Sequence, residues 1–425
     1  MKTKEIVINN IFDVNKFSLD SKNLPNSICY LDTSSIIRNI INKKQYLNKD
    51  KKNYPSRAKR IVKKDTILYS TVRPNLEHFG FIDRLKSNLI ASTGYVTLNI
   101  KENIKDISPK FIYYSLTQPH ITYHLHRIAS NSVTSYPSIN PDDLGDLKFN
   151  IPRDINYQNE IALFLSAIEN KIKINVEINK KLEEITKLIY EFWFLQFNFP
   201  NSEGKPYKIN NGKMIFDDKL KNELPVDWNY GKIKDYSKLN GGYAFKSSSW
   251  IEDGLKVIRI KNINDDYTVS THNCSSVSKK EFSKLSEFEV KYGDVVIALT
   301  GATVGKYGII PKNEDKILIN QRVGFFDLGN KPLDKLPFLI NSLNQNYFRK
   351  TIYNISNGSD QDNISTDEIE EIPLILPPVE LMNKYNELCK PYFKTIINNQ
   401  SINQKLINYF NWVTPRLING EFKLN

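Results

Sequence analysis

Three long polar side chains beside glycine or proline are the residues best suited to read the bases of a nucleic acid. Arg73 precedes Pro74, and Gln321 and Arg322 stand shortly before Gly324. Arginine donates two parallel hydrogen bonds to guanine, and glutamine pairs in a similar two-point manner with adenine. We therefore interpret Arg73, Gln321 and Arg322 as loop residues that contact base edges, with a solvated surface side chain as the alternative for each.

Four lysines have the chemistry of phosphate contacts instead: Lys63, Lys64, Lys246 and Lys306. A lysine carries a charge without a fixed pair of donors, so it positions a nucleic acid rather than reading its sequence. The turn from Gly301 to Gly305 would also bring backbone N–H groups close to a phosphate. Gly301 is therefore a candidate as well.

Three tyrosines, Tyr69, Tyr95 and Tyr243, have rings that could stack on bases. Each stands in or beside a segment typical of a strand, and aromatic residues in strands lie in a core more often. We therefore expect these rings to be structural.

The composition of the chain favours a polyanionic partner. Its 425 residues include 59 Lys and Arg against 47 Asp and Glu, which gives a formal net charge of +12. Phosphates attract such a basic surface over long distances. Hydrophobic residues make up 40% of the chain and charged residues 25%, as in ordinary globular domains. The length predicts two large or three medium domains.

The sequence indicates neither a disulfide framework nor a metal site. The three cysteines are far apart and odd in number: Cys29, Cys274 and Cys389. His120, His124 and His126 lie close together, but no cysteine or second cluster nearby completes four ligands. No stretch approaches the ~18 apolar residues that span a bilayer, and the start has no secretion signal. We expect a protein of the reducing cytoplasm, away from the membrane.

The two halves of the chain repeat each other with a period of roughly 225 to 230 residues, which is long enough to duplicate whole domains. Lys64–Thr71 aligns with Gly293–Thr300, and in both an acidic turn opens an apolar strand. Ser138–Leu144 aligns with Asn363–Ile369, and both have the pattern of a helix N-cap. Two further stretches repeat in the same order: Phe79–Ile82 with Tyr307–Ile310, and Ile90–Tyr95 with Asn320–Phe325.

Two segments resemble enzyme motifs but fit them poorly. Gly301–Lys306 is shorter than the phosphate-binding loop of nucleotide hydrolases, and no Ser or Thr follows its lysine. Pro141–Lys148 offers the carboxylates and lysine of a nuclease, but the second copy of the repeat has Pro373 where Lys148 stands. A helix N-cap followed by a surface strand explains Pro141–Lys148 more simply.

Each copy of the repeat ends in a strand closed by proline, followed by a long helical pattern. Apolar residues recur there at the alternating three- and four-residue spacing of a coiled-coil seam. The residues that we expect to pair the two helices are Ile168, Asn175, Ile178, Leu182, Ile396, Asn399 and Leu406. Asn175 and Asn399 occupy matching places, where a buried polar pair would fix the register. A helix of about 35 to 40 residues is on the order of 55 Å long; the alternative is that each helix packs on its own domain.

The order of domain, helix, domain and helix resembles the specificity (S) subunit of type I restriction-modification systems over essentially the whole chain. In the first half, Tyr54–Asp65, Ser70–Asn75 and Ala91–Gly94 resemble one common type of target recognition domain. In the second half, Leu224–Trp228 resembles the family's entry signature and Gly241–Ser247 its glycine turn. Three more stretches follow in the family's order: Ile258–Ile260, Gly301–Lys306 and Asn320–Arg322.

The first half departs from the family pattern in two places. It lacks a clear Leu-Pro-x-x-Trp entry, and it has Arg73–Asn75 where the second half has the turn that begins at Gly301. We therefore expect the two halves to read different DNA sequences. Through the matched stretches, the resemblance adds Ser70 and Thr93 to the candidate DNA contacts.

The resemblance implies a mixed α/β fold with two globular target recognition domains, each built on twisted sheets. Two long helices would separate these domains and pair as an antiparallel coiled coil, with pseudo-two-fold symmetry. The expected boundaries are residues 1–153 for the first recognition domain, 154–200 for the first spacer helix, 201–377 for the second recognition domain and 378–425 for the second spacer helix.

In function, the resemblance implies a non-catalytic subunit in which each recognition domain reads one half-site of a bipartite, asymmetric target in double-stranded DNA. Two methyltransferase subunits, and in the full complex restriction subunits with motor and nuclease activity, would assemble around it. The sequence has no Asn-Pro-Pro-aromatic stretch and no glycine-rich cofactor loop after a strand, so we expect S-adenosylmethionine on the partner methyltransferase. Two alternatives stay open: the recognition subunit of a related type II system, and a protein-binding scaffold that uses only its coiled coil.

Overall fold

The computed structural model describes most of the chain and divides it into two compact units. The first unit is Met1–Lys173 together with Leu406–Asn425, and the second is Ile174–Lys405. The described residues are 2–20, 23–50, 54–85, 88–131, 137–218, 222–264, 266–271, 274–313, 315–356, 363–422 and 424, with only the backbone of 281–283.

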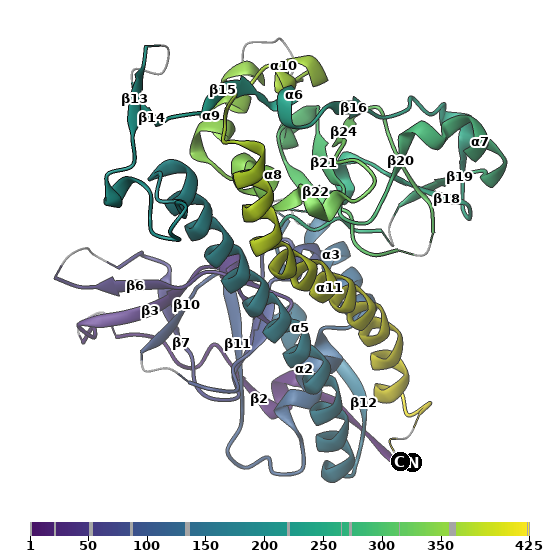
Figure 1. Ribbon diagram of the computed structural model, residues 1–425. Helices are drawn as coiled ribbons and strands as arrows, with labels where there is room; N and C mark the ends of the chain where they lie inside the picture. Colours follow the sequence, from purple (N-terminus) through teal and green to yellow (C-terminus); the bar gives the residue numbers. More distant parts are fainter. Residues whose placement is uncertain are drawn as a thin grey trace. The chain divides into compact units, whose positions relative to one another are not determined.

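The first unit is built on two four-stranded sheets (Figure 1). The order in its antiparallel sheet is β2 (Phe12–Val14), β11 (Tyr95–Ile100), β8 (Ile67–Ser70) and β9 (Phe79–Phe81). The order in its mixed sheet is β6 (Gln45–Asn48), β3 (Ser27–Leu31), β10 (Leu89–Ser92) and β7 (Ala58–Ile61), in which β3 and β10 run parallel. Three helices follow these strands: α2 (Pro109–Leu116), α3 (Pro119–Ser130) and α4 (Pro141–Gly145).

The second unit has a four-stranded and a five-stranded sheet. The order in its antiparallel sheet is β16 (Leu239–Gly241), β24 (Val323–Phe326), β21 (Val295–Ala298) and β22 (Tyr307–Ile309). The order in its mixed sheet is β17 (Trp250–Ile251), β19 (Ser275–Val277), β18 (Leu255–Ile258), β23 (Ile317–Ile319) and β20 (Glu289–Val290), in which β18 and β23 run parallel. Three helices again follow: α8 (Leu336–Leu343), α9 (Asn346–Ser356) and α10 (Thr366–Glu370).

Shorter elements complete both units. Each unit has a two-stranded antiparallel ribbon, formed by β1 (Thr3–Val7) with β12 (Lys148–Pro152) and by β15 (Asn229–Lys232) with β25 (Pro373–Leu376). A one-turn helix follows the first strand of each ribbon: α1 (Ile8–Ile11) and α6 (Ile233–Tyr236). The second unit also has a hairpin before its ribbon, β13 (Met214–Asp217) with β14 (Asn222–Pro225).

The repeat found in the sequence is therefore a repeat of strand order. In each antiparallel sheet, the strand after the acidic turn (β8 or β21) has two equivalent neighbours. One is the next strand along the chain (β9 or β22), and the other is the last strand of that sheet (β11 or β24). In both mixed sheets the last strand in chain order pairs in parallel with an early one, β10 with β3 and β23 with β18. The second unit differs by one additional edge strand, β17. The fold is mixed α/β, as the sequence predicts.

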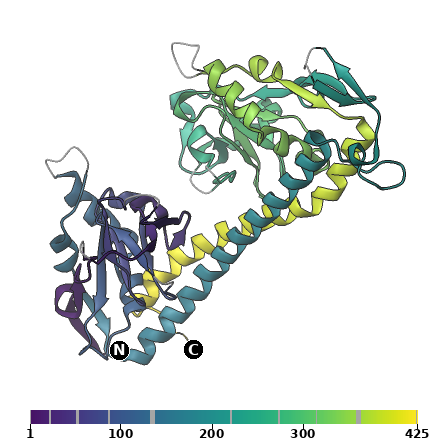
Figure 2. The same cartoon turned by 90° about the vertical axis from the view of Figure 1, so that its left-hand side faces the viewer.

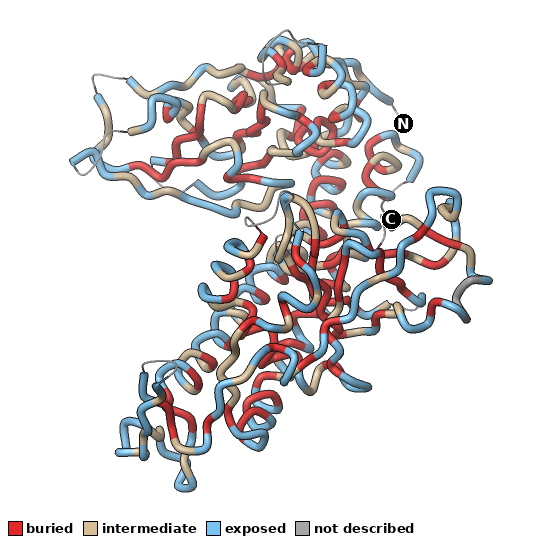
Figure 3. Tube along the Cα trace, turned by 90° about the horizontal axis from the view of Figure 1, so that it is seen from above, coloured by how far each residue is buried: buried red, intermediate tan, exposed pale blue. Residues whose placement is uncertain are grey.

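The central strands β8 and β21 are buried at every position because both of their faces are covered. Side chains of adjacent residues point to opposite faces of a sheet. Ile67 and Tyr69 accordingly join one core of the first unit, whereas Leu68 joins another. In the second unit, Val295 and Val296 separate in the same way. All residues of β8 and β21 are buried, so the position of the turns that follow them is fixed by packing. Figure 3 shows the buried residues of the chain in red.

Two long helices, α5 (Ile155–Tyr190) and α11 (Val379–Ile418), contribute to both units (Figure 2). In the second unit, Asn175 Nδ2 donates to Asn403 Oδ1 at 2.8 Å. Asn399 Nδ2 donates to Asn179 Oδ1 at 2.9 Å. A step of four residues forward on α5 is thus a step of four residues back on α11, so the helices run antiparallel there. In the first unit, the ends of α5 and α11 share one apolar core.

The residues expected to pair the helices are placed in different ways. Ile168 and Ile396 are buried, and Leu182 and Leu406 are partly buried against the cores. Ile178 is 40% exposed, so its assignment to the pairing face was wrong.

The buried seam of α5 instead passes through Asn175, Asn179 and Thr186. A helix turns once every 3.6 residues, so Ile178 points to a different side of α5 from these three residues. Asn175 and Asn399 do form amide pairs, but with Asn403 and Asn179 rather than with each other.

No helix in the described part of the chain combines the length and hydropathy that crossing a bilayer requires.

Replacing Asn403 with leucine should destabilise the second unit, because the buried amide of Asn175 would lose its partner. We expect a loss of about 1–3 kcal/mol in the free energy of unfolding, measured by urea denaturation of the full chain. The double variant Asn175→Leu/Asn403→Leu should recover most of this loss, since neither polar group is then buried. Glu184→Leu, at an exposed position of α5, is the control. A double variant as unstable as the two single variants combined would contradict the expected coupling.

Candidate nucleic-acid interface

Three polar turns meet at one end of the antiparallel sheet of the second unit. The backbone N–H of Leu299, after β21, donates to the carbonyl oxygen of Arg322 at 2.9 Å. The backbone N–H of Gln321 donates to the carbonyl oxygen of Tyr243 at 2.9 Å. The turn after β21, the β23–β24 connection and the segment after β16 therefore converge. Gln321, Arg322 and the Gly301 turn, which are far apart in sequence, lie in one cluster of turns.

The side chains of this cluster that could contact bases are exposed. Gln321 and Arg322 are both exposed, and the ring of Tyr243 is 40% exposed. Tyr69 and Tyr95 are 1% and 0% exposed, so they are core residues, as expected from their positions in strands. Tyr243 is the exception to that expectation, because it lies just beyond the end of β16. Its ring contacts those of Phe245 and Phe288, with 5.0 Å and 5.3 Å between centroids.

The turn after β21 needs its two glycines. Gly301 and Gly305 have φ angles of +77° and +78°, in the left-handed region that other residues rarely adopt. A Cβ atom on Gly305 would lie 2.5 Å from Cγ2 of Ile352. The N–H of Gly305 also donates to the carbonyl oxygen of Ala298 at 2.9 Å, which closes the turn. Gly301 therefore shapes the turn, and its backbone is only partly exposed.

A cavity of about 370 Å³ lies beside this turn and has a cationic lining. Lys306 lines it from the end of the turn, and Arg349 lines it from α9. The Thr303 hydroxyl is buried and has no hydrogen-bond partner in the described part of the chain. Two cations and a hydroxyl around one cavity suit a phosphate group.

Arg349 is held in this cavity by uncharged partners. Its Nη2 donates to the Tyr267 hydroxyl at 2.7 Å and to Asn344 Oδ1 at 3.2 Å. The Tyr307 hydroxyl also donates to Asn344 Oδ1. Burial raises the pKa of Tyr307 well above its usual value, so the hydroxyl stays a neutral donor. The guanidinium charge of Arg349 is therefore oriented without being neutralised by these contacts.

The first unit places Arg73 and Thr93 close together at the corresponding end of β8. The N–H of Thr71 donates to the carbonyl oxygen of Gly94 at 2.9 Å. The N–H of Thr93 donates to the carbonyl oxygen of Arg57 at 2.8 Å. Arg73 is exposed and has a φ angle of 49°. Non-glycine residues in this left-handed conformation are often functional, which agrees with a binding role for Arg73.

Ser70 does not fit the role of a direct DNA contact. It is 1% exposed, and its hydroxyl donates to the carbonyl oxygen of Val72 at 3.1 Å. Its oxygen also accepts from the N–H of Val72 at 3.2 Å. The prediction that Ser70 contacts DNA was therefore wrong, because Ser70 is the last residue of a strand that is covered on both faces of the sheet. Ser70 positions the turn that leads to Arg73.

The lysines expected to contact phosphates lie in three separate places. Lys63 and Lys64 are exposed at the beginning of β8, one strand length away from Arg73. Nζ of Lys63 lies 3.3 Å from the centroid of the Phe17 ring, so this ammonium group has a cation–π partner. Lys246 is exposed at the N-terminal end of a single 3₁₀ turn. Of the four, only Lys306 lines the cavity beside the glycine turn.

Sequence analysis missed Arg349, Thr303 and Arg57. Arg349 is on a helix and Arg57 precedes an edge strand, so neither stands in a glycine-rich loop. Only the packing of α9 against the turn brings Arg349 next to Lys306. Thr303 belongs to the Gly-Ala-Thr turn and could have been found there, because a small hydroxyl often accompanies such turns.

The segment that resembles a nuclease site, Pro141–Lys148, has a structural role. Asp143 Oδ2 accepts from the N–H of Asn140 at 2.7 Å and caps α4. Asp146 Oδ1 accepts from Asn9 Nδ2 at 3.0 Å. Within the described ranges, no group of three or more His, Cys, Asp and Glu residues is arranged to hold a metal ion.

Comparison with known proteins identifies the family of the chain. A model of the family described as "Type I restriction modification DNA specificity domain" matches residues 2–184 and 225–408, one match for each copy of the repeat. Together the matches cover most of the sequence, and the chain therefore belongs to this family. Members of the family are the specificity subunits of type I restriction-modification systems, which recognise DNA sequence and carry no catalytic centre.

Individual relatives agree with this assignment. The specificity subunit of the type I restriction enzyme HindI of Haemophilus influenzae is 22% identical, over 87% of this chain and 89% of that protein. The corresponding MjaVIII subunit of Methanocaldococcus jannaschii is 27% identical, over 72% of this chain and 67% of its own length. The crystal structure of a type I S subunit from M. genitalium has the same fold, with a TM-score of 0.57, 16% identity, and 98% of this chain and 96% of that chain covered.

Replacing Arg349 with alanine should weaken DNA binding to a similar extent for all sequences. A phosphate contact carries no sequence information, so the slope of log affinity against log salt should fall by about one. Fluorescence anisotropy over a series of salt concentrations measures both quantities. Lys350→Ala, at the neighbouring exposed position, is the matched control. An unchanged salt slope in Arg349→Ala would rule out a phosphate contact.

Replacing Gln321 with alanine should instead relax sequence preference. We expect a loss of about 1–3 kcal/mol on the preferred duplex and a smaller loss on duplexes with a changed base pair. The duplexes are taken from the motif that sequencing of methylated host DNA reveals. An equal loss on all duplexes would assign Gln321 to the phosphate backbone.

Proposed function

We propose that this chain reads a bipartite, asymmetric target in double-stranded DNA, one half-site with each unit. The observation that carries the proposal is the repeated strand order, which gives each unit a turn after the same central strand and a neighbouring turn beside it. In both units these turns expose arginine, Arg73 in the first and Arg322 in the second, and the exposed Arg57 lies beside Thr93 in the first. The net charge of +12 supports a polyanionic partner.

The two half-sites should differ in sequence. In the first unit the turn places Arg73 before Pro74, with a left-handed backbone at Arg73. In the second unit the turn has glycine at its first position and a phosphate-sized cavity beside it. Different side chains on equivalent turns would read different bases from a shared scaffold. An asymmetric target follows, even though the scaffold is repeated.

The paired helices would fix the distance between half-sites. The α5 helix has 36 residues, which corresponds to roughly 54 Å at 1.5 Å rise per residue. The two asparagine pairs would hold the antiparallel register, because a slip of one turn would leave one asparagine pair in place of two. In this proposal α5 and α11 form an antiparallel coiled coil that acts as a spacer.

Shortening both helices by one turn should shorten the gap in the DNA target. Removing residues 176–179 and 399–402 keeps the Asn175–Asn403 pair and the register while taking out about 6 Å. With a rise of ~3.4 Å per base pair, the gap should shrink by one or two base pairs. Sequencing of methylated DNA from cells with the variant reads the new motif. A variant with alanine at residues 176 and 177 and unchanged length is the control, and an unaltered gap after the deletion would contradict the spacer role.

Methyltransferase subunits would dock on an apolar stripe that faces solvent along α5 and the π-helical turn Glu191–Leu195 that follows it. Six residues of the second unit form the stripe: Ile174, Ile178, Ile185, Leu188, Phe192 and Leu195. Their exposed fractions range from 37% to 64%. Most are spaced three, four or seven residues apart, which is the pattern of a second helix-pairing face. The exposure of Ile178 thus has a natural explanation in a partner helix.

Replacing Leu188 with aspartate should weaken the complex with the methyltransferase subunit at least tenfold. A charge in the centre of an apolar contact must be desolvated without compensation. Binding of the purified partner is measured by surface plasmon resonance, while DNA binding by the isolated chain should not change. Lys180→Asp, at an exposed position on another face of the same helix, is the control. Equal partner affinity in Leu188→Asp and Lys180→Asp would exclude the stripe as the docking surface.

The methyl donor, S-adenosylmethionine, would be bound by the methyltransferase, and restriction subunits would join the complex through it. This chain would contribute the choice of DNA sequence and the geometry of assembly.

A further inference from the structure

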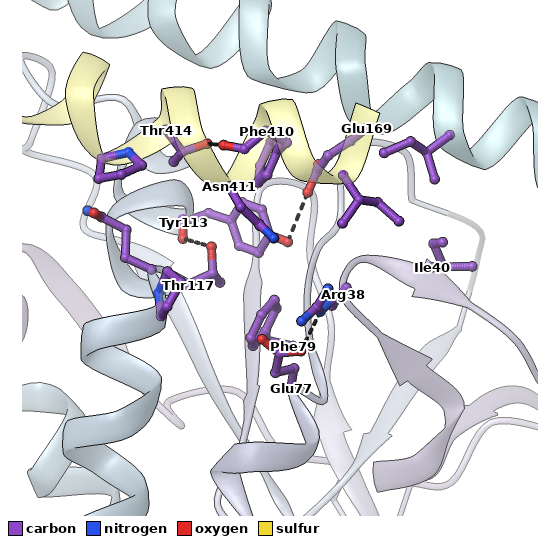
Figure 4. Close-up of a pocket in the computed structure, with 15 residues that line it drawn as sticks. Arg38, Ile40, Glu77, Phe79, Tyr113, Thr117, Glu169, Phe410, Asn411 and Thr414 are labelled. Carbon is purple, nitrogen blue, oxygen red and sulfur yellow. Dashed lines mark hydrogen bonds and ion pairs between the residues drawn. The ribbon is translucent and has the colours of Figure 1, made fainter. Parts of the chain in front are cut away.

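A cavity of about 220 Å³ in the first unit lies outside the cluster of turns (Figure 4). The antiparallel sheet, α2, α5 and the last part of α11 all contribute to its lining. Its polar side chains include Glu169, Gln118 and the Arg38–Glu77 ion pair. None of these residues has a part in the proposed contacts with DNA.

Glu169 brings an unneutralised acid to this cavity. Its carboxylate accepts from Asn39 Nδ2 at 2.8 Å, from the Tyr114 hydroxyl at 2.9 Å and from the Tyr113 hydroxyl at 3.4 Å. All three donors are uncharged, and Glu169 makes no ion pair within the described residues. Burial raises the pKa of Glu169, and the hydrogen bonds from Asn39 and Tyr114 partly oppose this effect. A carboxylate in such surroundings favours a cation that can enter the cavity.

Two cations of the chain in this region are already engaged elsewhere. Arg38 pairs with Glu77, and both side chains line the cavity (Figure 4). Lys110 pairs with Asp83 at 2.9 Å. Each of these pairs is neutral overall, so the charge of Glu169 is the net charge that the described lining presents. An anionic ligand would be repelled by it.

Gln118 supplies a second acceptor. This residue is 3% exposed, lines the cavity, and its Oε1 has no hydrogen-bond partner in the described part of the chain. A buried acceptor without a partner costs about 1–3 kcal/mol, which a ligand with N–H groups would recover. The acid and the amide oxygen together select a ligand that donates hydrogen bonds.

The remaining lining suits a short aliphatic or aromatic body. Phe79, Tyr113 and Phe410 contribute rings, and further apolar contacts come from Ile40, Ile172, Ile407, Pro119 and Pro415. Aromatic faces attract ammonium groups through their quadrupole, and apolar side chains cover the methylene groups. The combination of acid, acceptor and rings is that of an amine-binding pocket.

We propose that this cavity binds a small primary ammonium compound, whose charged nitrogen contacts the Glu169 carboxylate and Gln118 Oε1 and whose carbon chain lies among Phe79, Phe410 and Ile407. The proposal goes beyond DNA recognition, because the cavity is lined by α5 and α11 as well as by the sheet of the first unit. An occupied cavity would tie these elements together. The ligand would thereby stabilise the first unit against unfolding.

Isothermal titration calorimetry of the full chain with n-pentylammonium chloride tests the proposal. At pH 8 the probe keeps its charge, since an alkylammonium has a pKa near that of lysine, about 10.4. We expect saturable binding at one site, and at least tenfold weaker binding of 1-pentanol, which has the same carbon chain without the charge. Equal binding of the two probes, or no binding of the amine, would overturn the proposal.

Glu169→Gln removes the charge and retains an acceptor for Asn39 and Tyr114. It should weaken amine binding by about tenfold to hundredfold, as expected for the loss of a charged hydrogen bond. Glu160→Gln, an exposed acid on the same helix, is the matched control and should bind as the natural chain does.

Ile407→Trp provides a second variant that leaves Glu169 in place and fills the cavity. It should abolish binding of the amine, and thermal unfolding verifies that each variant is folded. Undiminished binding in folded Ile407→Trp would place the amine elsewhere and refute the assignment.

Discussion

The central strand of each unit is packed on both faces, and this burial positions the turn that follows it. Ile67 and Tyr69 enter one core while Leu68 enters another, and Val295 and Val296 divide in the same way. A strand held from two sides cannot shift by one residue without moving its side chains into the wrong cores. The residue that ends the strand, and the polar turn beyond it, are therefore placed within narrow limits. A rigid scaffold with variable turns is the arrangement that sequence recognition requires.

The second constraint is polar and lies between the helices. Asparagine amides at Asn175, Asn179, Asn399 and Asn403 form two pairs where apolar side chains would be more stabilising. Such pairs exchange stability for a defined register. In a protein proposed to measure a distance along DNA, register is the property that must not vary. The apolar stripe through Ile185 and Leu188 has the opposite character, because it is exposed in the chain alone and would be stabilised by a partner.

Each of the two cavities contains a charged side chain that uncharged side chains hold in place. Arg349 is oriented by a tyrosine and an asparagine, which leaves its positive charge available beside Lys306. Glu169 is oriented by two tyrosines and an asparagine, which leaves a negative charge inside the first unit. Neutral donors and acceptors hold a charged group in place without cancelling its field. The two cavities therefore favour ligands of opposite charge.

The sequence by itself determined the duplication, the mixed α/β class, the two long helices and the family. These properties are recorded in local patterns: apolar strands after acidic turns, N-cap residues, and seams with three- and four-residue spacing. Glycine-containing turns also pointed to Gln321, Arg322 and Lys306 as candidate contacts, because an unusual backbone conformation restricts residue type. Only the tertiary structure decided that Ser70 is buried, that Ile178 faces solvent, and that Asn175 pairs with Asn403. The convergence of Arg349 with Lys306, and of Glu169 with Gln118, likewise depends on contacts between elements far apart in the chain. Local periodicity fixes which residues form an element, whereas the packing of one element against another decides which face is covered and which side chains meet.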